Sequence, residues 1–190
     1  MKDLEDSLKM SFGKIETQDL KTIIALFKPE VIHKGKYFLK TGRFANKLSY
    51  IKSGFLRIFA ESDKKEITQW ISTKGYFVTD LASFINDTPA RWTIQALEET
   101  EIYSIYKEDY NNIRNLIPEW NCMEKTFIVH CFNTLEDRVF SHLSMTAEER
   151  YNFFFENNKE LFNQVPLQYI ASILGMTPET FSRIRKKQLP

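Results

Sequence analysis

The chain has 190 residues, 43% of them hydrophobic and 27% charged, and a formal net charge of +1. This composition is ordinary for a globular protein with a sizeable core, and it excludes a chain that is basic over its whole surface. No stretch approaches the roughly 20 apolar residues of a membrane span, and no apolar run follows the first lysine, so we expect a cytoplasmic protein without membrane contact.

The first 27 residues are expected to form two helices. Leu4, Leu8 and Phe12 recur at four-residue spacing, and a second amphipathic stretch follows Thr17 and ends at Pro29. The apolar face of that second stretch consists of Leu20, Ile23, Ile24 and Phe27.

From Pro29 to about Tyr106 the sequence predicts strands. Short runs rich in Ile, Tyr, Phe and Val alternate with turn signals at mostly 7- to 13-residue spacing, which is typical of an antiparallel barrel or sandwich. Residues 48–51 and 56–58, on either side of Ser53-Gly54, are interpreted as a β-hairpin.

Beyond Tyr106 the pattern is helical. A short helix is predicted over 107–115, and Pro118 opens a long one that ends before a break at 144–146. Apolar or small side chains at three- and four-residue spacing predict a seam for a partner helix, and packing against the chain's own barrel is the alternative. The seam consists of Trp120, Met123, Phe127, Cys131, Thr134, Leu135, Val139 and Leu143.

The segment from Val165 to Lys187 carries the most specific pattern. After a helix predicted over 147–157, an apolar face with the small residue Ala171 is followed by Gly175, and Thr177-Pro178 opens the next helix. A small residue four positions before a glycine, with an inward Phe181 six residues further on, indicates a helix-turn-helix. A helical hairpin without a DNA role is the alternative.

The exposed face of the second helix predicts the DNA contacts. Arg183 is suited to bidentate pairing with guanine, and Glu179 can accept from cytosine. A mere surface ion pair between these two residues is the alternative. The predicted DNA-binding residues are Thr177, Glu179, Thr180, Ser182, Arg183, Lys186 and Lys187.

Several motifs together resemble the Crp/Fnr family of regulators, and particularly its Bacteroidetes branch. They are Lys34-Gly35, Gly42, Tyr50-Ile-Lys-Ser-Gly-Phe-Leu-Arg-Ile58, Gly75-Tyr-Phe, Glu148-Glu-Arg-Tyr151, and the segment from Val165 to Lys187. The resemblance covers the chain from about residue 10. It implies an α+β protein with an N-terminal cyclic-nucleotide-binding-like jelly-roll barrel, a dimerisation helix and a C-terminal helix-turn-helix domain, with Glu179 and Arg183 at base-contacting positions.

The family's nucleotide cassette is altered in this chain. The resemblance implies a Gly-Glu pair before a short helix and an arginine some ten residues later that binds the cyclic phosphate. Here Thr79 and Asp80 replace the pair, while Ala90 takes the arginine position and Arg91 is displaced by one. A one-residue shift on a strand turns a side chain to the other face unless a β-bulge at Pro89 restores it, so we do not expect a cyclic nucleotide to bind. The alternatives are that Asp80 is a helix cap and that Arg91 is a surface residue on an edge strand. The candidate effector pocket is Thr79, Asp80, Leu81, Ala90 and Arg91.

The remaining residues predict neither a metal site nor catalysis. Cys122 and Cys131 lack metal-ligand spacing and are expected to be reduced thiols, and two cysteines are too few for the iron–sulfur cluster of one family branch. No Gly-rich phosphate loop or catalytic motif is present, so we expect no enzyme. At the DNA-binding end, Pro178 replaces an arginine of many relatives, and 157–164 is too short for a β-hairpin wing.

These patterns predict a sequence-specific DNA-binding transcription regulator with an unknown effector. Its predicted parts are a sensor domain over 1–116, a dimerisation helix over 117–144 and a helix-turn-helix domain over 145–190. The expected partners are double-stranded DNA and a second copy of the chain through 117–144, with RNA polymerase as a further candidate. The alternative is a ligand-sensing or interaction module whose C-terminal helices do not bind DNA.

Overall fold

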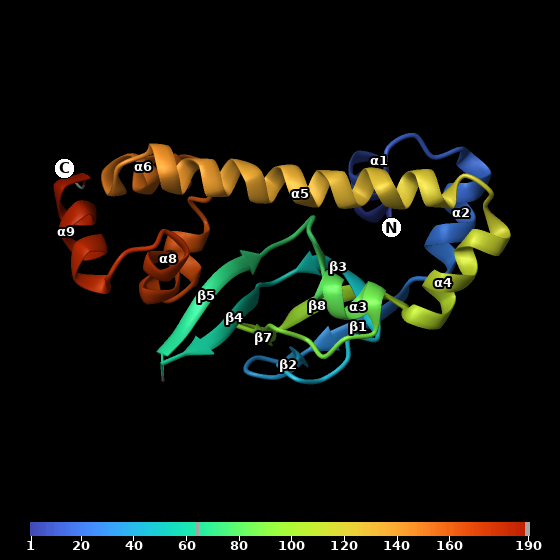
Figure 1. Ribbon diagram of the computed structural model, residues 1–190, viewed down its shortest axis with the longest axis horizontal. Helices are drawn as coiled ribbons and strands as arrows, with labels where there is room; N and C mark the ends of the chain where they lie inside the picture. Colours follow the sequence, from blue (N-terminus) through green and yellow to red (C-terminus); the bar gives the residue numbers. More distant parts are fainter. Residues whose placement is uncertain (64, 189–190) are drawn as a thin grey trace. The chain divides into compact units, whose positions relative to one another are not determined.

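The computed structural model describes residues 1–63 and 65–188 (Figure 1). The chain folds into two compact units. The first comprises Met1–Ile58 with Ile71–Cys131, and the second comprises Phe59–Trp70 with Phe132–Pro190. The three-part division expected from the sequence stays a prediction.

Two N-terminal helices pack on the first unit as their apolar spacing predicts. They are α1 (Lys2–Phe12) and α2 (Thr17–Ala25). The predicted faces are confirmed, since Leu4, Leu8 and Phe12 are at most 2% exposed and the second face is buried except for Ile24, which is half-buried. The ring of Phe12 stacks on Phe127 at 4.4 Å between centroids. The helices thus close over the same aromatic core as the barrel.

The strands form two four-stranded sheets of an antiparallel jelly roll, which confirms the predicted α+β fold class. One sheet has the order β1 (Lys28–Ile32), β8 (Thr100–Tyr106), β3 (Lys47–Ser53) and β6 (Phe77–Val78). The other has the order β2 (Tyr37–Leu39), β7 (Thr93–Ala96), β4 (Leu56–Ser62) and β5 (Lys65–Ser72). Helix α3 (Leu81–Asn86) connects β6 to β7.

The predicted hairpin at Ser53-Gly54 is wrong. Strands β3 and β4 belong to different sheets, so this turn carries the chain from one sheet to the other. Gly54 has φ +90°, and a Cβ placed there would lie 2.5 Å from the Thr100 hydroxyl oxygen and 2.8 Å from the Glu99 carbonyl oxygen. Glycine is therefore required for the close approach of two chain segments as well as for the turn.

The long helix is present, and its predicted seam divides into two parts. Helix α4 (Lys107–Leu116) precedes α5 (Trp120–Ser144). Trp120, Met123 and Phe127 are at most 6% exposed and belong to the core of the first unit, so assigning them to a partner was wrong and packing on the chain's own core applies there. The exposed seam positions are Thr134, Leu135, Val139 and Leu143.

Four helices build the C-terminal part of the second unit. They are α6 (Ala147–Asn157), α7 (Leu161–Gln164), α8 (Leu167–Ile173) and α9 (Pro178–Gln188). Thr146 caps α6 in a capping box with Glu149, in which each side chain binds the other residue's backbone N–H. The sequence did not predict α7, which lies where longer relatives are expected to carry a wing.

Candidate nucleic-acid interface and sensor cassette

A cluster of aromatic side chains packs against the buried face of α9. Tyr151 of α6, Phe162 of α7 and Phe181 of α9 are at most 6% exposed, and their ring centroids lie 5.3–6.0 Å apart. Ile184 is buried one turn further along α9, and Ala171 of α8 is fully buried, which confirms the predicted inward face. Rings at these separations attract one another beyond the apolar area that they bury. The cluster fixes which side of α9 remains in solvent.

The turn between α8 and α9 is a Schellman motif. Gly175 has φ +67° and donates its N–H to the Ser172 carbonyl at 3.0 Å, while Met176 donates to the Ala171 carbonyl at 2.9 Å. Thr177 then caps α9, accepting from the N–H of Thr180 at 3.2 Å. The turn therefore links the direction of α9 to the end of α8 through backbone hydrogen bonds.

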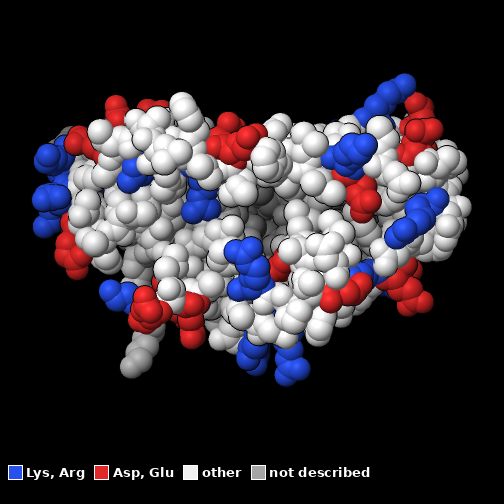
Figure 2. All heavy atoms as spheres, in the orientation of Figure 1, with Lys and Arg blue, Asp and Glu red and all other residues white. Residues whose placement is uncertain are grey.

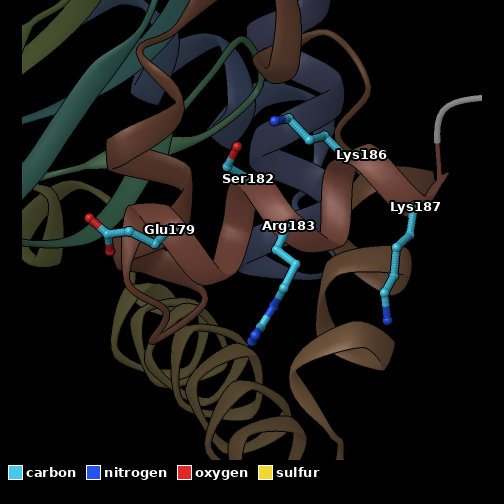
Figure 3. Close-up of a pocket in the computed structure, with 5 residues that line it drawn as sticks. All are labelled: Glu179, Ser182, Arg183, Lys186 and Lys187. Atoms are coloured by element: carbon cyan, nitrogen blue, oxygen red, sulfur yellow. The ribbon is translucent and has the colours of Figure 1, made fainter.

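Five of the predicted DNA-binding side chains line an open hollow on the exposed face of α9. Glu179, Ser182, Arg183, Lys186 and Lys187 line it, and in Figure 3 Arg183 and Lys187 extend to one side of the helix and Ser182 and Lys186 to the other. Figure 2 shows basic side chains at the left edge of the molecule with acidic ones beside them, and further basic side chains over the rest of the visible face. Thr177 is exposed and Thr180 is half-buried at the helix start. All seven residues thus belong to one helix and its cap.

The acid at the start of α9 is an accessible hydrogen-bond acceptor. The pKa of Glu179 is lowered because its carboxylate accepts from its own backbone N–H and from the Thr177 hydroxyl. Within the described length of α9, no ion pair joins it to Arg183. Because both side chains are exposed and not paired with each other, each can meet a base edge.

The carboxylate of Asp80, which the sequence predicts at the position of a ribose-binding acid, binds the protein backbone. One oxygen accepts the N–H of Ser83 at 3.1 Å and caps α3, and the other accepts the N–H groups of Arg91 and Trp92 at 2.8 and 3.3 Å. The side chain is only 4% exposed. These hydrogen bonds join the start of α3 to the two residues that precede β7.

The other four residues of the candidate effector pocket make contacts of their own. The Thr79 hydroxyl donates to the Lys47 carbonyl at 2.9 Å, Leu81 packs against the core, and Ala90 is buried and bears no charge. The exposed guanidinium of Arg91 lies 5.6 Å from the ring centroid of Trp92. The structure brings these five residues together, but it presents neither a free acid nor an inward-facing cation.

Over residues 1–63 and 65–188, no three His, Cys, Asp or Glu side chains are grouped closely enough to hold a metal ion. Over the same ranges, no helix combines the length and apolarity needed to span a bilayer.

Sequence reasoning missed two arginines that bind the C-terminal end of α8. Arg138 of α5 donates to the Ile173 carbonyl at 3.3 Å, and Arg150 of α6 donates to the Leu174 carbonyl at 3.1 Å. Each is a basic residue at a half-buried position of an amphipathic helix, which was the available signal. Periodicity shows that such a residue faces inward but does not show what it binds.

The strand-rich part of the chain is similar to a known domain family. Residues 29–115 match the model of the cyclic nucleotide-binding domain. The matched segment covers somewhat less than half of the chain. A search of curated proteins by sequence found no match.

Solved structures extend the likeness beyond the cyclic nucleotide-binding domain. FixK2 from Bradyrhizobium japonicum matches 85% of this chain and 83% of its own at 16% identity, with TM-score 0.69. The c-di-GMP-responsive global regulator CLP of Xanthomonas campestris matches 91% of each chain at 18% identity, with TM-score 0.65. The catabolite activator protein of Thermus thermophilus matches 95% of this chain and 85% of its own at 18% identity, with TM-score 0.60.

At the level of the fold these matches confirm the resemblance to the Crp/Fnr regulators. Two of the three structures are named as an activator or a regulator, and none is named as an enzyme. Membership of the Bacteroidetes branch stays a prediction.

Proposed function

We propose that the chain is a homodimeric, sequence-specific DNA-binding transcription regulator in which α9 enters the major groove. The observation that carries this proposal is the exposed face of α9, where four polar or charged side chains surround Arg183. Helix α9 follows α8 after a turn at Gly175. In helix-turn-helix proteins, the second of two helices joined by such a turn is the recognition helix, which lies in the major groove of DNA.

The exposed face has side chains for both kinds of DNA contact. Arg183 pairs with guanine and Glu179 accepts from cytosine, because both extend from the exposed side of the first two turns. Lys186, Lys187 and the hydroxyl groups of Thr177, Thr180 and Ser182 contact phosphates, which orient the helix without reading sequence. The excess of base over acid in α9 attracts the DNA backbone.

The exposed apolar part of α5 supports a dimer. Beyond Cys131, large apolar side chains of α5 remain between 48% and 81% exposed. They are Phe132, Leu135, Val139, Phe140 and Leu143. A patch of this kind is covered by a partner in most proteins, and a second copy of α5 offers a matching surface. The two copies of α9 then read half-sites about one helical turn apart.

The effector of the proposed regulator is not a cyclic nucleotide held in the usual way. Asp80 is bonded to three backbone N–H groups, and Ala90 offers no cation at the position where the resemblance implies the phosphate-binding arginine. Another effector is proposed to act by binding the DNA-binding conformation and the inactive conformation of the protein with different affinities. Contact with RNA polymerase remains part of the same proposal.

The test is selection from a randomised duplex library at fixed salt, with and without cAMP and cGMP. We expect a palindromic site to be enriched, and its binding to fall at least 100-fold on Arg183→Glu, which reverses a charge at the DNA surface. The control Arg114→Glu reverses an exposed charge in α4 and is expected to leave binding unchanged.

Two results would decide against parts of the proposal. If no sequence is enriched and Arg183→Glu changes nothing, the chain is a sensing or interaction module without DNA binding. If cAMP or cGMP raises the affinity at least tenfold, the cassette binds a nucleotide in spite of Asp80 and Ala90.

A further inference from the structure

The carboxyl end of α8 is held by side chains from two other helices. Arg138 of α5 donates to the carbonyl of Ile173, the last residue of α8, at 3.3 Å. Arg150 of α6 donates through Nε to the carbonyl of the next residue, Leu174, at 3.1 Å, and through Nη1 to the Met145 carbonyl at 2.7 Å. Two guanidinium groups thus meet at the point where α8 turns toward α9.

These contacts are well suited to fixing a helix end. The last carbonyls of a helix lack intrahelical donors and carry the negative end of its dipole. A cation that donates to them therefore supplies both a missing hydrogen bond and a favourable charge interaction. Arg138 is half-buried, and burial lowers the pKa of its guanidinium, which nevertheless stays protonated. A charged donor with reduced access to water binds a carbonyl more strongly than an exposed one.

Strand β5 also contacts the carboxyl end of α8. The Thr68 N–H donates to the Ser172 hydroxyl oxygen at 2.8 Å, and the Ser172 hydroxyl lies 3.5 Å from the Thr68 carbonyl oxygen. The guanidinium of Arg138 lies 5.6 Å from the ring centroid of Trp70, two residues further along β5. The strand therefore contacts α8 directly through Ser172 and indirectly through Arg138.

We propose that Arg138, Arg150 and Ser172 form a clamp, the α8 clamp, whose residues position the reading helix for DNA recognition. The inference rests on the proposed function and names residues that act on DNA binding without touching DNA. Gly175 and Met176, which begin the turn to α9, donate to carbonyls of α8 itself. A change at the end of α8 is therefore transmitted to α9 through these two hydrogen bonds.

The clamp also connects strand β5 to the reading helix within the second unit. Strand β5 contacts both Ser172 and Arg138, so a shift of its end alters the hydrogen bonds at the end of α8. An effector that moves β5 then changes the direction of α9 by loosening or tightening the clamp. No residue of the DNA-facing surface has to change its own contacts.

The test measures amide hydrogen exchange of the free, full-length chain in parallel with DNA binding. Arg138→Gln and Arg150→Gln are each expected to accelerate exchange at the Gly175 and Met176 amides about tenfold or more, the size expected on losing a charged hydrogen bond. Exchange in β3 and β8 should not change. Affinity for the selected site should fall about tenfold, with an unchanged salt slope because no phosphate contact is lost.

Conservative and matched variants distinguish the loss of these hydrogen bonds from other effects of substitution. Arg138→Lys should restore most of the protection because a lysine can donate to the Ile173 carbonyl, whereas Arg150→Lys should restore less because Arg150 binds two carbonyls. Ser172→Ala should accelerate exchange at the same two amides. The control Arg114→Gln removes an exposed guanidinium that donates to the Asn111 carbonyl at 2.9 Å, and it should have no effect on them.

The outcomes separate the clamp from the proposed function. Unchanged exchange at Gly175 and Met176 in both glutamine variants would overturn the clamp, as would an equal acceleration by Arg114→Gln. Faster exchange throughout the chain would also overturn it, because it indicates general loss of stability. If no DNA site is ever selected, exchange at these amides still decides whether the clamp exists, and only the proposed function fails.

Discussion

Replacing Asp80 with alanine tests whether this carboxylate is a structural group or a ligand-binding one. In the structure it accepts three backbone N–H groups, one at the start of α3 and two just before β7. Loss of a helix cap costs about 1 kcal/mol, and loss of each of the other two hydrogen bonds costs about 1 kcal/mol more. We expect a total loss of about 3 kcal/mol in the free energy of unfolding.

Thermal unfolding followed by circular dichroism measures this loss. For a chain of this size, about 3 kcal/mol lowers the midpoint by roughly 6 to 12 °C. Asp80→Asn should lose about half as much, because one amide oxygen can replace one carboxylate oxygen but not both. The control Asp6→Ala removes an exposed carboxylate of α1 and should shift the midpoint by less than about 2 °C.

One result would refute this reasoning. If Asp80→Ala unfolds at the wild-type temperature while a measurable affinity for cAMP disappears, the carboxylate serves a ligand. The three backbone hydrogen bonds would then contribute nothing to stability.

Three further predictions concern other parts of the chain. Gly54→Ala should destabilise the protein by at least about 2 kcal/mol more than Gly35→Ala in denaturant titrations, because both glycines have positive φ but only Gly54 has neighbours that a Cβ would strike. Val139→Glu should convert a dimer to a monomer in sedimentation velocity, since it places a charge among the exposed apolar side chains of α5, whereas Met10→Glu in α1 should not. The Thr146 backbone N–H and hydroxyl lower the pKa of the Glu149 carboxyl below 4.5. The ionised carboxylate therefore stabilises the fold above pH 4.5, and this stabilisation is lost as the pH falls through the lowered pKa. Between pH 6 and 3 the thermal midpoint of Glu149→Gln should fall less than that of the wild type.

Each of these predictions has an opposite outcome. Equal losses for the two glycine variants would show that the contact at Gly54 relaxes without cost. A dimer that survives Val139→Glu would place the subunit contact elsewhere. A Glu149→Gln variant that follows the wild-type acid dependence would show that the capping box does not contribute to it.

The helix-turn-helix was predictable because its signals are local. Gly175, Thr177 and Pro178 stand at the positions that a helix end and the next helix start require, and these needs do not depend on distant residues. The apolar faces around Ala171 and Phe181 were predictable for the same reason. Helical spacing alone fixes which side chains share a face.

The errors in the sequence interpretation concern partners far along the chain. A glycine turn between two strand signals looks the same in a hairpin and in a crossing between sheets, so Ser53-Gly54 did not show which occurs. Spacing likewise showed that Trp120 and Phe127 face one side of a helix, but not whether that side meets the chain's own core or a partner. The contact between Thr68 and Ser172 joins residues 104 positions apart, and no local pattern predicts it.

The aromatic cluster beneath α9 has a consequence for how this kind of protein can diversify. The residues that anchor the helix, Phe181 and Ile184, are buried, whereas Glu179, Ser182 and Arg183 are exposed and share no packing role with them. Under the proposed function, gene duplication followed by exchange of exposed positions could give a new binding site at little cost to folding. On that proposal, the residues that determine specificity and those that determine stability are different residues of the same helix, and each set can change without the other.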